Sequence, residues 1–128
     1  MVDIDIICVY KAPIEKVHKA LTEEKDFQAW WTKDSKTSKD EGSTLRFEFN
    51  DDFCVFKLIK QEQDYIEWKC TDAKMINTPE WIGTTIIFQL RETEYGTELN
   101  FSHKNWLDET KCYNKCTKGW KHFIEDSL

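Results

Sequence analysis

The sequence predicts an α+β fold in which a curved antiparallel sheet wraps around one C-terminal helix. Three observations support this prediction. Short segments between residues 3 and 103 alternate apolar and polar side chains, which is the period of a half-buried strand. Short turn sequences separate most of these segments, so consecutive strands should pair antiparallel. After residue 103 the apolar period changes to three and four residues, which indicates a helix with one apolar face.

The first part of the chain should form one strand, two helices and a loop. Residues Asp3 to Tyr10 are rich in Ile and Val, as expected for a strand. Pro13 suits the start of a helix, because its missing N–H would have no partner there. Apolar positions then recur at helical spacing over residues 14–22, and a second short helix should cover Glu24 to Trp31. The polar stretch from Thr32 to Ser43 should be a mobile loop.

Five strands should follow this loop. They are Leu45–Phe49, Phe53–Gln61, Tyr65–Cys70, Trp81–Arg91 and Thr97–His103. A longer polar connection, residues 71–80, contains Pro79 and should link the third of them to the fourth. Alternation assigns one common inner face to Leu45, Phe47, Phe49, Ile66, Trp68, Thr84, Ile86, Phe88, Leu99, Phe101 and His103.

The last segment should be a long helix that packs on the concave face of the sheet. Its stripe at three- and four-residue steps consists of Tyr113, Cys116, Trp120, Phe123, Ile124 and Ser127. An antiparallel sheet can leave one face in water, but its other face has to be covered. Because the final helix is the one long element left for this role, we expect Trp120 and Phe123 to meet the sheet.

Length and composition are those of one globular domain over residues 1–128. With 40% hydrophobic and 33% charged residues, the chain can build a core without disulfides or metal. Its net charge of −6, with Arg46 and Arg91 as the only arginines, argues against nucleic-acid binding. No long apolar run and no signal-peptide pattern occur, so we expect no membrane span and a cytoplasmic location. The five cysteines should therefore remain reduced thiols.

A series of local motifs, taken in order, narrows the fold further. They are Pro13-Ile14-Glu15-Lys16-Val17, Ala20-Leu21-Thr22, Trp30-Trp31, Gly42-Ser43, Phe47-Glu48-Phe49, Ile66-Glu67-Trp68, Trp81-Ile82-Gly83-Thr84-Thr85-Ile86, Gly96-Thr97-Glu98-Leu99-Asn100-Phe101 with His103, and Gly119-Trp120. Together they resemble the helix-grip domains of the START-like, or SRPBCC, superfamily. Within it they resemble the AHSA-type branch, which is named after activators of a heat-shock-protein ATPase. The resemblance covers nearly the whole chain. It implies a space between sheet and last helix that can hold a ligand.

The 18 aromatic residues supply most of the apolar bulk. Most of these rings should be ordinary core, because buried aromatics dominate core energetics. The resemblance adds a second interpretation, in which some of them line an apolar ligand cavity. The candidates are Trp30, Trp31, Phe47, Phe49, Phe56, Trp68, Thr84, Phe88, Phe101, His103, Trp120 and Phe123. Trp30 and Trp31 are adjacent beside the loop, so we expect their rings to point to different sides, and one of them could gate the entrance.

Few residues suggest catalysis or metal binding. His103 should be either a hydrogen-bonded core histidine or a polar or acid–base group of the cavity. No carboxylate is evidently placed to orient it, so we assign no catalytic residue. Cys112 and Cys116 lie one helical turn apart, but zinc needs two further ligands, and neither His103 nor His122 stands at a known spacing. We therefore predict no metal and no cofactor, and we expect Cys116 to act as a small hydrophobic residue.

Three functions remain open at this stage. The first is a non-enzymatic domain that binds a small apolar or amphipathic molecule. The second, implied by the resemblance alone, is a protein-interaction or co-chaperone-like module acting on a heat-shock chaperone ATPase. The third is a cyclase- or aromatase-like enzyme, which would need His103 and a carboxylate facing one cavity. In each case we expect a monomer or a weak homodimer.

Overall fold

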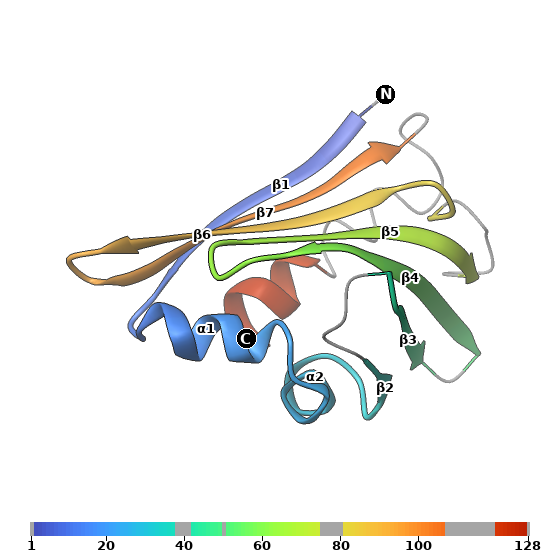
Figure 1. The fold of residues 1–128 in the computed structure, drawn as a ribbon, viewed down its shortest axis with the longest axis horizontal. Coiled ribbons are helices and arrows are strands. Elements are labelled where there is room, and N and C mark those ends of the chain that lie inside the picture. The colour runs from blue at the N-terminus through green and yellow to red at the C-terminus, as the bar shows by residue number, and fades with distance from the viewer. Residues whose placement is uncertain (1, 38–41, 50, 75–80, 107–119, 128) are drawn as a thin grey trace.

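The computed structural model describes residues 2–37, 42–49, 51–74, 81–106 and 120–127. Within these ranges the chain has an α+β fold with one curved antiparallel sheet of seven strands. Two helices and a C-terminal helical segment lie on the same side of this sheet (Figure 1). The predicted class of fold is therefore confirmed, although the sheet has one strand more than the sequence indicated.

The strands run in the order β1-β7-β6-β5-β4-β3-β2 across the sheet. Their bounds are β1 (Val2–Tyr10), β2 (Asp34–Lys36), β3 (Thr44–Phe49), β4 (Asp52–Gln61), β5 (Tyr65–Lys74), β6 (Thr85–Thr93) and β7 (Gly96–Trp106). The helices are α1 (Ile14–Ala20) and α2 (Glu24–Trp30), and a π-helical segment η1 (His122–Ser127) follows near the C-terminus.

The two edges of the sheet are β1 and β2. These strands follow each other in the sequence but lie at opposite ends of the sheet. Helices α1 and α2 connect them and so cross the inner face from one edge to the other (Figure 1). Strands β3 to β7 form a meander, and β1 closes it by pairing antiparallel with β7. This crossing places α2 over the inner face of the sheet, where the aromatic side chains gather.

The loop predicted from Thr32 to Ser43 is wrong over residues 34–36, which form β2. Ser35 is fully buried there and stands opposite Phe47 of β3. Its hydroxyl donates a 2.6 Å hydrogen bond to the carbonyl oxygen of Thr32. A polar segment can thus supply an edge strand, because the buried hydroxyl finds its acceptor within the same segment.

The predicted strand Trp81–Arg91 is also wrong at its start, since β6 begins only at Thr85. Residues 81–83 form a turn in which Gly83 adopts a φ of 89°, a conformation that favours glycine. The buried Thr84 closes this turn by donating from its hydroxyl to the Trp81 carbonyl oxygen at 2.6 Å. Alternation of apolar residues cannot distinguish such a turn from the strand that follows it.

The preceding strand is longer than predicted. We expected Tyr65–Cys70, with a loop from residue 71, but β5 continues to Lys74. The extension pairs with β4, where Ala73 stands opposite Cys54. The added residues give β5 the same length as β4, so the two strands pair along almost their whole extent.

Both predicted N-terminal helices are confirmed, and a hydrogen bond fixes how they meet. The indole Nε1–H of Trp30 in α2 donates to the carbonyl oxygen of Ala20, the last residue of α1, at 2.7 Å. The expected long C-terminal helix lies in part outside the described residues, which resume at Trp120. From there the chain is helical to Ser127, and the Tyr10 hydroxyl of β1 donates to the Ile124 carbonyl oxygen at 2.5 Å.

The hairpin between β6 and β7 closes tightly against the end of β1. Gly96 has a φ of 143°, and a Cβ atom at this position would overlap the carbonyl oxygen of Tyr10. The buried hydroxyl of the next residue, Thr97, donates to the Ala12 carbonyl oxygen at 2.8 Å. A glycine is therefore required at position 96, where the β6–β7 hairpin meets the end of β1.

Candidate functional site

A cluster of aromatic rings fills the space between the inner face of the sheet and the elements that cover it. Its buried members are Phe27, Trp30, Trp31, Phe47, Phe56, Trp68, Trp81, Phe88, Phe101 and Trp120. Strand residues reach this cluster because every second side chain of β3 to β7 points inward. We call this set of ten residues the inner cluster.

Trp31 connects three parts of the inner cluster. Its ring centroid lies 4.3 Å from that of Phe47 on β3 and 5.1 Å from that of Trp120. It also lies 5.5 Å from the ring of Phe49, which is only partly buried. The contacts of Trp31 thus join the end of α2 to the sheet and to the C-terminal segment, and they extend to a partly buried ring.

The prediction that Trp30 and Trp31 point to different sides is wrong. Both indoles are buried, and they stack with an interplanar angle of 10° and a centroid distance of 5.8 Å. Trp31 is the C-cap of α2 and still donates its backbone N–H to the Phe27 carbonyl oxygen at 2.9 Å, but its φ of −113° departs from the helical value and so changes the rotation between the two side chains. The neighbouring indoles can then face the same interior.

A chain of three hydrogen bonds crosses one end of the inner cluster. The Trp120 indole Nε1–H donates to His103 Nδ1 at 3.1 Å. Because an indole can only donate, Nδ1 must be the unprotonated nitrogen, and the proton of the neutral imidazole lies on Nε2. Nε2–H then donates to the Thr84 hydroxyl oxygen at 2.7 Å, and that hydroxyl donates onward to the Trp81 carbonyl oxygen.

This arrangement favours a structural role for His103. The imidazole is fully buried, and desolvation lowers its pKa from 6.5 to about 3. It is therefore neutral near pH 7, and both of its nitrogens already have partners. An acid–base catalyst needs a nitrogen that can reach a substrate, so the alternative interpretation as a catalytic group gains no support.

The structure brings almost all predicted pocket candidates together. Ten of the twelve are buried on the inner side, while Phe49 is partly buried at its margin. The side chain of Phe123 lies outside the described residues. These positions agree with the predicted inner face, and whether they line a ligand cavity stays a prediction.

Sequence reasoning missed two members of the inner cluster. The Trp81 ring lies 4.7 Å from the His103 ring, edge to face, and 5.8 Å from that of Trp120. It was overlooked because alternation along the predicted strand Trp81–Arg91, which assigned Thr84 and Ile86 to the inner face, puts Trp81 on the opposite face. Phe27 contacts the rings of Phe47 and Trp68 at 5.2 and 5.6 Å. The three-residue step from Phe27 to Trp30 in a short helix was the signal that could have identified it.

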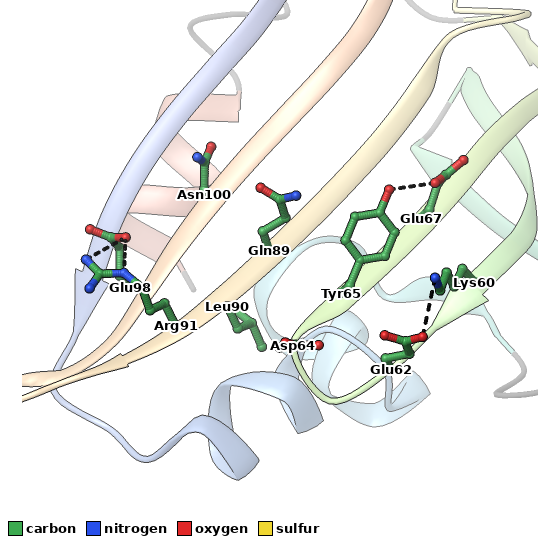
Figure 2. A pocket seen from close by; sticks show the side chains of 10 residues that line it. All are labelled: Lys60, Glu62, Asp64, Tyr65, Glu67, Gln89, Leu90, Arg91, Glu98 and Asn100. Carbon is green, nitrogen blue, oxygen red and sulfur yellow. Dashed lines mark hydrogen bonds and ion pairs between the residues drawn. The ribbon is translucent and has the colours of Figure 1, made fainter.

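A groove of about 710 Å³ lies on the opposite, outer face of the sheet (Figure 2). Its lining residues are Lys60, Glu62, Asp64, Tyr65, Glu67, Gln89, Leu90, Arg91, Glu98 and Asn100. Most of the charges in it are already paired with one another. Arg91 contacts Glu98 at 3.1 Å, Lys60 contacts Glu62 at 3.4 Å, and the Tyr65 hydroxyl donates to Glu67 at 2.7 Å. The groove therefore has the character of a solvated sheet face.

Other chemistry finds no support in the described part of the chain. Within it, no three His, Cys, Asp or Glu residues are grouped closely enough to hold a metal ion. Cys112 and Cys116 lie outside the described residues. Burial raises the pKa of the Cys54 thiol well above its usual value and that of Cys70 to about 12, so both remain protonated. Among the described helices, none is long and apolar enough to cross a membrane.

The fold and the inner cluster correspond to a known class of protein. The family described as activator of Hsp90 ATPase homolog 1-like protein matches residues 11–128. The chain therefore belongs to this family, and it is an AHSA-type domain of the START-like superfamily, as the sequence motifs predicted. The sequence matches none of the curated proteins.

Solved structures of related proteins share the whole architecture. The solution structure of the Aha1 dimer from Colwellia psychrerythraea is 34% identical, with a TM-score of 0.86 over 98% of this chain and 92% of that one. A protein from Mesorhizobium loti is 17% identical, with a TM-score of 0.84 over 97% of this chain and 92% of its own. DynU16, from the dynemicin biosynthetic locus, is 16% identical, with a TM-score of 0.80 over 96% of this chain but 44% of its own. The last two show a shared fold alone.

Proposed function

We propose that this chain is one domain that binds a small apolar or amphipathic molecule between the sheet and the C-terminal segment. The observation that carries this proposal is the continuous series of aromatic ring contacts in the inner cluster. It extends from the fully buried Trp68 through Trp31 to the partly buried Phe49. Ligand pockets are typically apolar surfaces of this kind with a few polar groups.

Trp31 is the side chain whose movement would admit such a molecule. It stands between α2, β3 and the C-terminal segment, so a change of its rotamer opens space among all three. Phe49 marks the side from which a ligand would approach, because it is the partly buried end of the same contact chain and the other rings of that chain are buried. A bound apolar molecule would replace the ring contacts that Trp31 gives up.

The bonding of His103 supports a binding role over an enzymatic one. A cyclase- or aromatase-like reaction needs a group that gives or takes a proton from the substrate. The lone pair of Nδ1 is held by the Trp120 indole, and the Nε2 proton is directed at Thr84. This leaves His103 to hold the C-terminal segment against the sheet.

Thermal unfolding of delipidated protein tests the proposal. We expect a member of a panel of fatty acids and aromatic compounds, including lauric acid and anilinonaphthalene sulfonate, to raise Tm. At a ligand concentration of 100 Kd the stabilisation would be about 2.7 kcal/mol. If no compound in the panel shifts Tm, the proposal is wrong.

A pair of neighbouring variants locates the site. Trp31→Phe should weaken binding of the active compound, because Trp31 lies at the proposed point of entry. Trp30→Phe is the matched control, since Trp30 is equally aromatic and buried but is tied to the Ala20 carbonyl oxygen. Equal effects of both variants on ligand affinity would place the site elsewhere.

Family membership supports a second candidate function, which is interaction with a protein. The family description names activation of the Hsp90 ATPase, and the relative from Colwellia psychrerythraea is described as a dimer. We propose on this ground that the chain also self-associates, and that it could act on a chaperone ATPase. The measurement for the latter is the ATPase rate of the cognate Hsp90 with and without this protein. An unchanged rate would remove the chaperone role.

A further inference from the structure

The edge strand β1 is longer than the strand at the opposite edge of the sheet. It has nine residues and pairs with β7 on one side, while the sheet order places no strand of the described chain on its other side. The opposite edge, β2, has three residues, and both Asp34 and Lys36 are exposed there. Very short edge strands resist pairing with another strand, whereas long ones present a row of backbone groups for it.

The side chains of β1 reinforce this difference. Ile7 is 64% exposed and Val9 is 49% exposed on the outer face, while Ile4 and Ile6 are buried on the inner face. The strand contains no lysine, arginine or proline, which are the residues that commonly protect an edge. Two neighbouring apolar side chains thus lie in water beside backbone groups that can accept a strand.

We propose that β1 is the interface through which two copies of this chain associate, as an antiparallel β1–β1 pair about a two-fold axis near Ile7. The proposal rests on the self-association suggested above and assigns a surface to it. A two-fold dimer uses the same patch on both subunits, and an edge strand paired antiparallel with its own copy meets this requirement. The two seven-stranded sheets would then form one continuous sheet.

The charges along the strand fit this pairing. Asp5 is exposed two residues before Ile7, and Val9 is exposed two residues after it. With the axis at Ile7, Asp5 of one copy stands opposite Val9 of the other. The two Asp5 carboxylates therefore do not face each other, which would destabilise a strand pair. The two Ile7 residues meet at the centre.

The experiment compares the mass of three forms of the full chain by light scattering over a range of concentrations. We expect the wild type to form a dimer and the double variant Ile7→Lys, Val9→Lys to raise its dissociation constant about tenfold or more. The matched control is Ile59→Lys, because Ile59 is 41% exposed but lies on β4, in the middle of the sheet. It should leave the dissociation constant unchanged.

Two other results would overturn the proposal in different ways. A wild type that stays monomeric at every concentration contradicts self-association itself, and the surface fails with it. A wild type that dimerises equally well after the β1 substitutions contradicts only the choice of surface. Far-UV circular dichroism of each variant shows that it is folded, so a loss of the dimer cannot be attributed to unfolding. Ligand binding to the inner cluster is measured separately and is unaffected by either result.

Discussion

The two faces of the sheet are made by the same strands, but the side chains of one face are buried and those of the other are exposed to solvent. On the inner face, Trp68 is 1% exposed and its ring contacts those of Phe47, Phe56 and Phe88. On the outer face, its neighbour Glu67 accepts a hydrogen bond from Tyr65 at the margin of an open groove. One step along β5 therefore separates a close-packed apolar interior from a solvated surface of paired charges.

This difference separates the roles that the two faces can have. Removing atoms from a buried ring lowers the free energy of unfolding strongly, because the surrounding side chains do not refill the cavity that is left. Exposed ion pairs contribute little, since water and salt compete with them. Stability and internal binding should therefore depend on the inner face. Contacts with other proteins should depend on the outer face and the β1 edge.

The largest effect should come from Trp68→Ala, which removes the ring at the centre of the inner cluster. We expect the free energy of unfolding to fall by about 3–5 kcal/mol, measured by urea denaturation. Tyr95→Ala is the matched control, because Tyr95 is 77% exposed and should change stability by less than about 0.5 kcal/mol. Similar losses for the two variants would mean that the faces do not differ as described.

A smaller loss should follow Thr84→Val, which keeps the shape of the side chain but removes its hydroxyl. His103 Nε2–H then loses the Thr84 hydroxyl as its acceptor, at a cost of about 1–3 kcal/mol, while the Trp81 carbonyl oxygen keeps the Thr84 backbone N–H as a donor at 3.0 Å. Thr71→Val is the control, since Thr71 is exposed and makes only a long 3.4 Å contact with the Val55 carbonyl oxygen. Equal urea midpoints for the two variants would contradict the importance of the buried chain.

The pH dependence of stability should report the burial of His103. Its pKa of about 3 in the folded state lies below the ordinary 6.5, so at intermediate pH the unfolded chain binds the extra proton. The stability contributed by the neutral ring is complete above pH 6.5 and falls by up to about 1.4 kcal/mol per unit between there and pH 3. The difference in unfolding free energy between wild type and His103→Gln, measured at pH 7 and pH 5, isolates this contribution. A difference that does not change with pH would rule it out.

The smallest effect should come from Arg91→Ala on the outer face. Arg91 is 69% exposed and Glu98 is 28% exposed at the side chain, so their ion pair should contribute less than about 1 kcal/mol. A double-mutant cycle with Glu98→Ala at low and high salt measures this coupling. A coupling energy comparable to the loss in Trp68→Ala would show that the outer face is also a stabilising layer.

Prediction from the sequence succeeded in segments where the apolar residues recur with one regular spacing. Strict alternation in Leu45–Phe49 and Tyr65–Cys70 identified strands and their buried faces, because a half-buried strand has that pattern and few alternatives do. It failed at Asp34–Lys36 and at Trp81–Gly83. The first is a polar strand stabilised by the pairing of Ser35 with Phe47, and the second is an apolar turn. In both segments, contacts with distant residues decided the local structure.

The candidate site shows the same division. Nearly all inner-face candidates could be named from periodicity, yet their bonding could not. The sequence alone determined the family, the antiparallel sheet and the apolar composition of its inner face, because these follow from patterns within single segments. Only the tertiary structure decided that Trp120 and Thr84 engage both nitrogens of His103, that Trp30 and Trp31 stack, and that β1 is an edge. These features join residues far apart in the chain, and their geometry is set by how the layers pack.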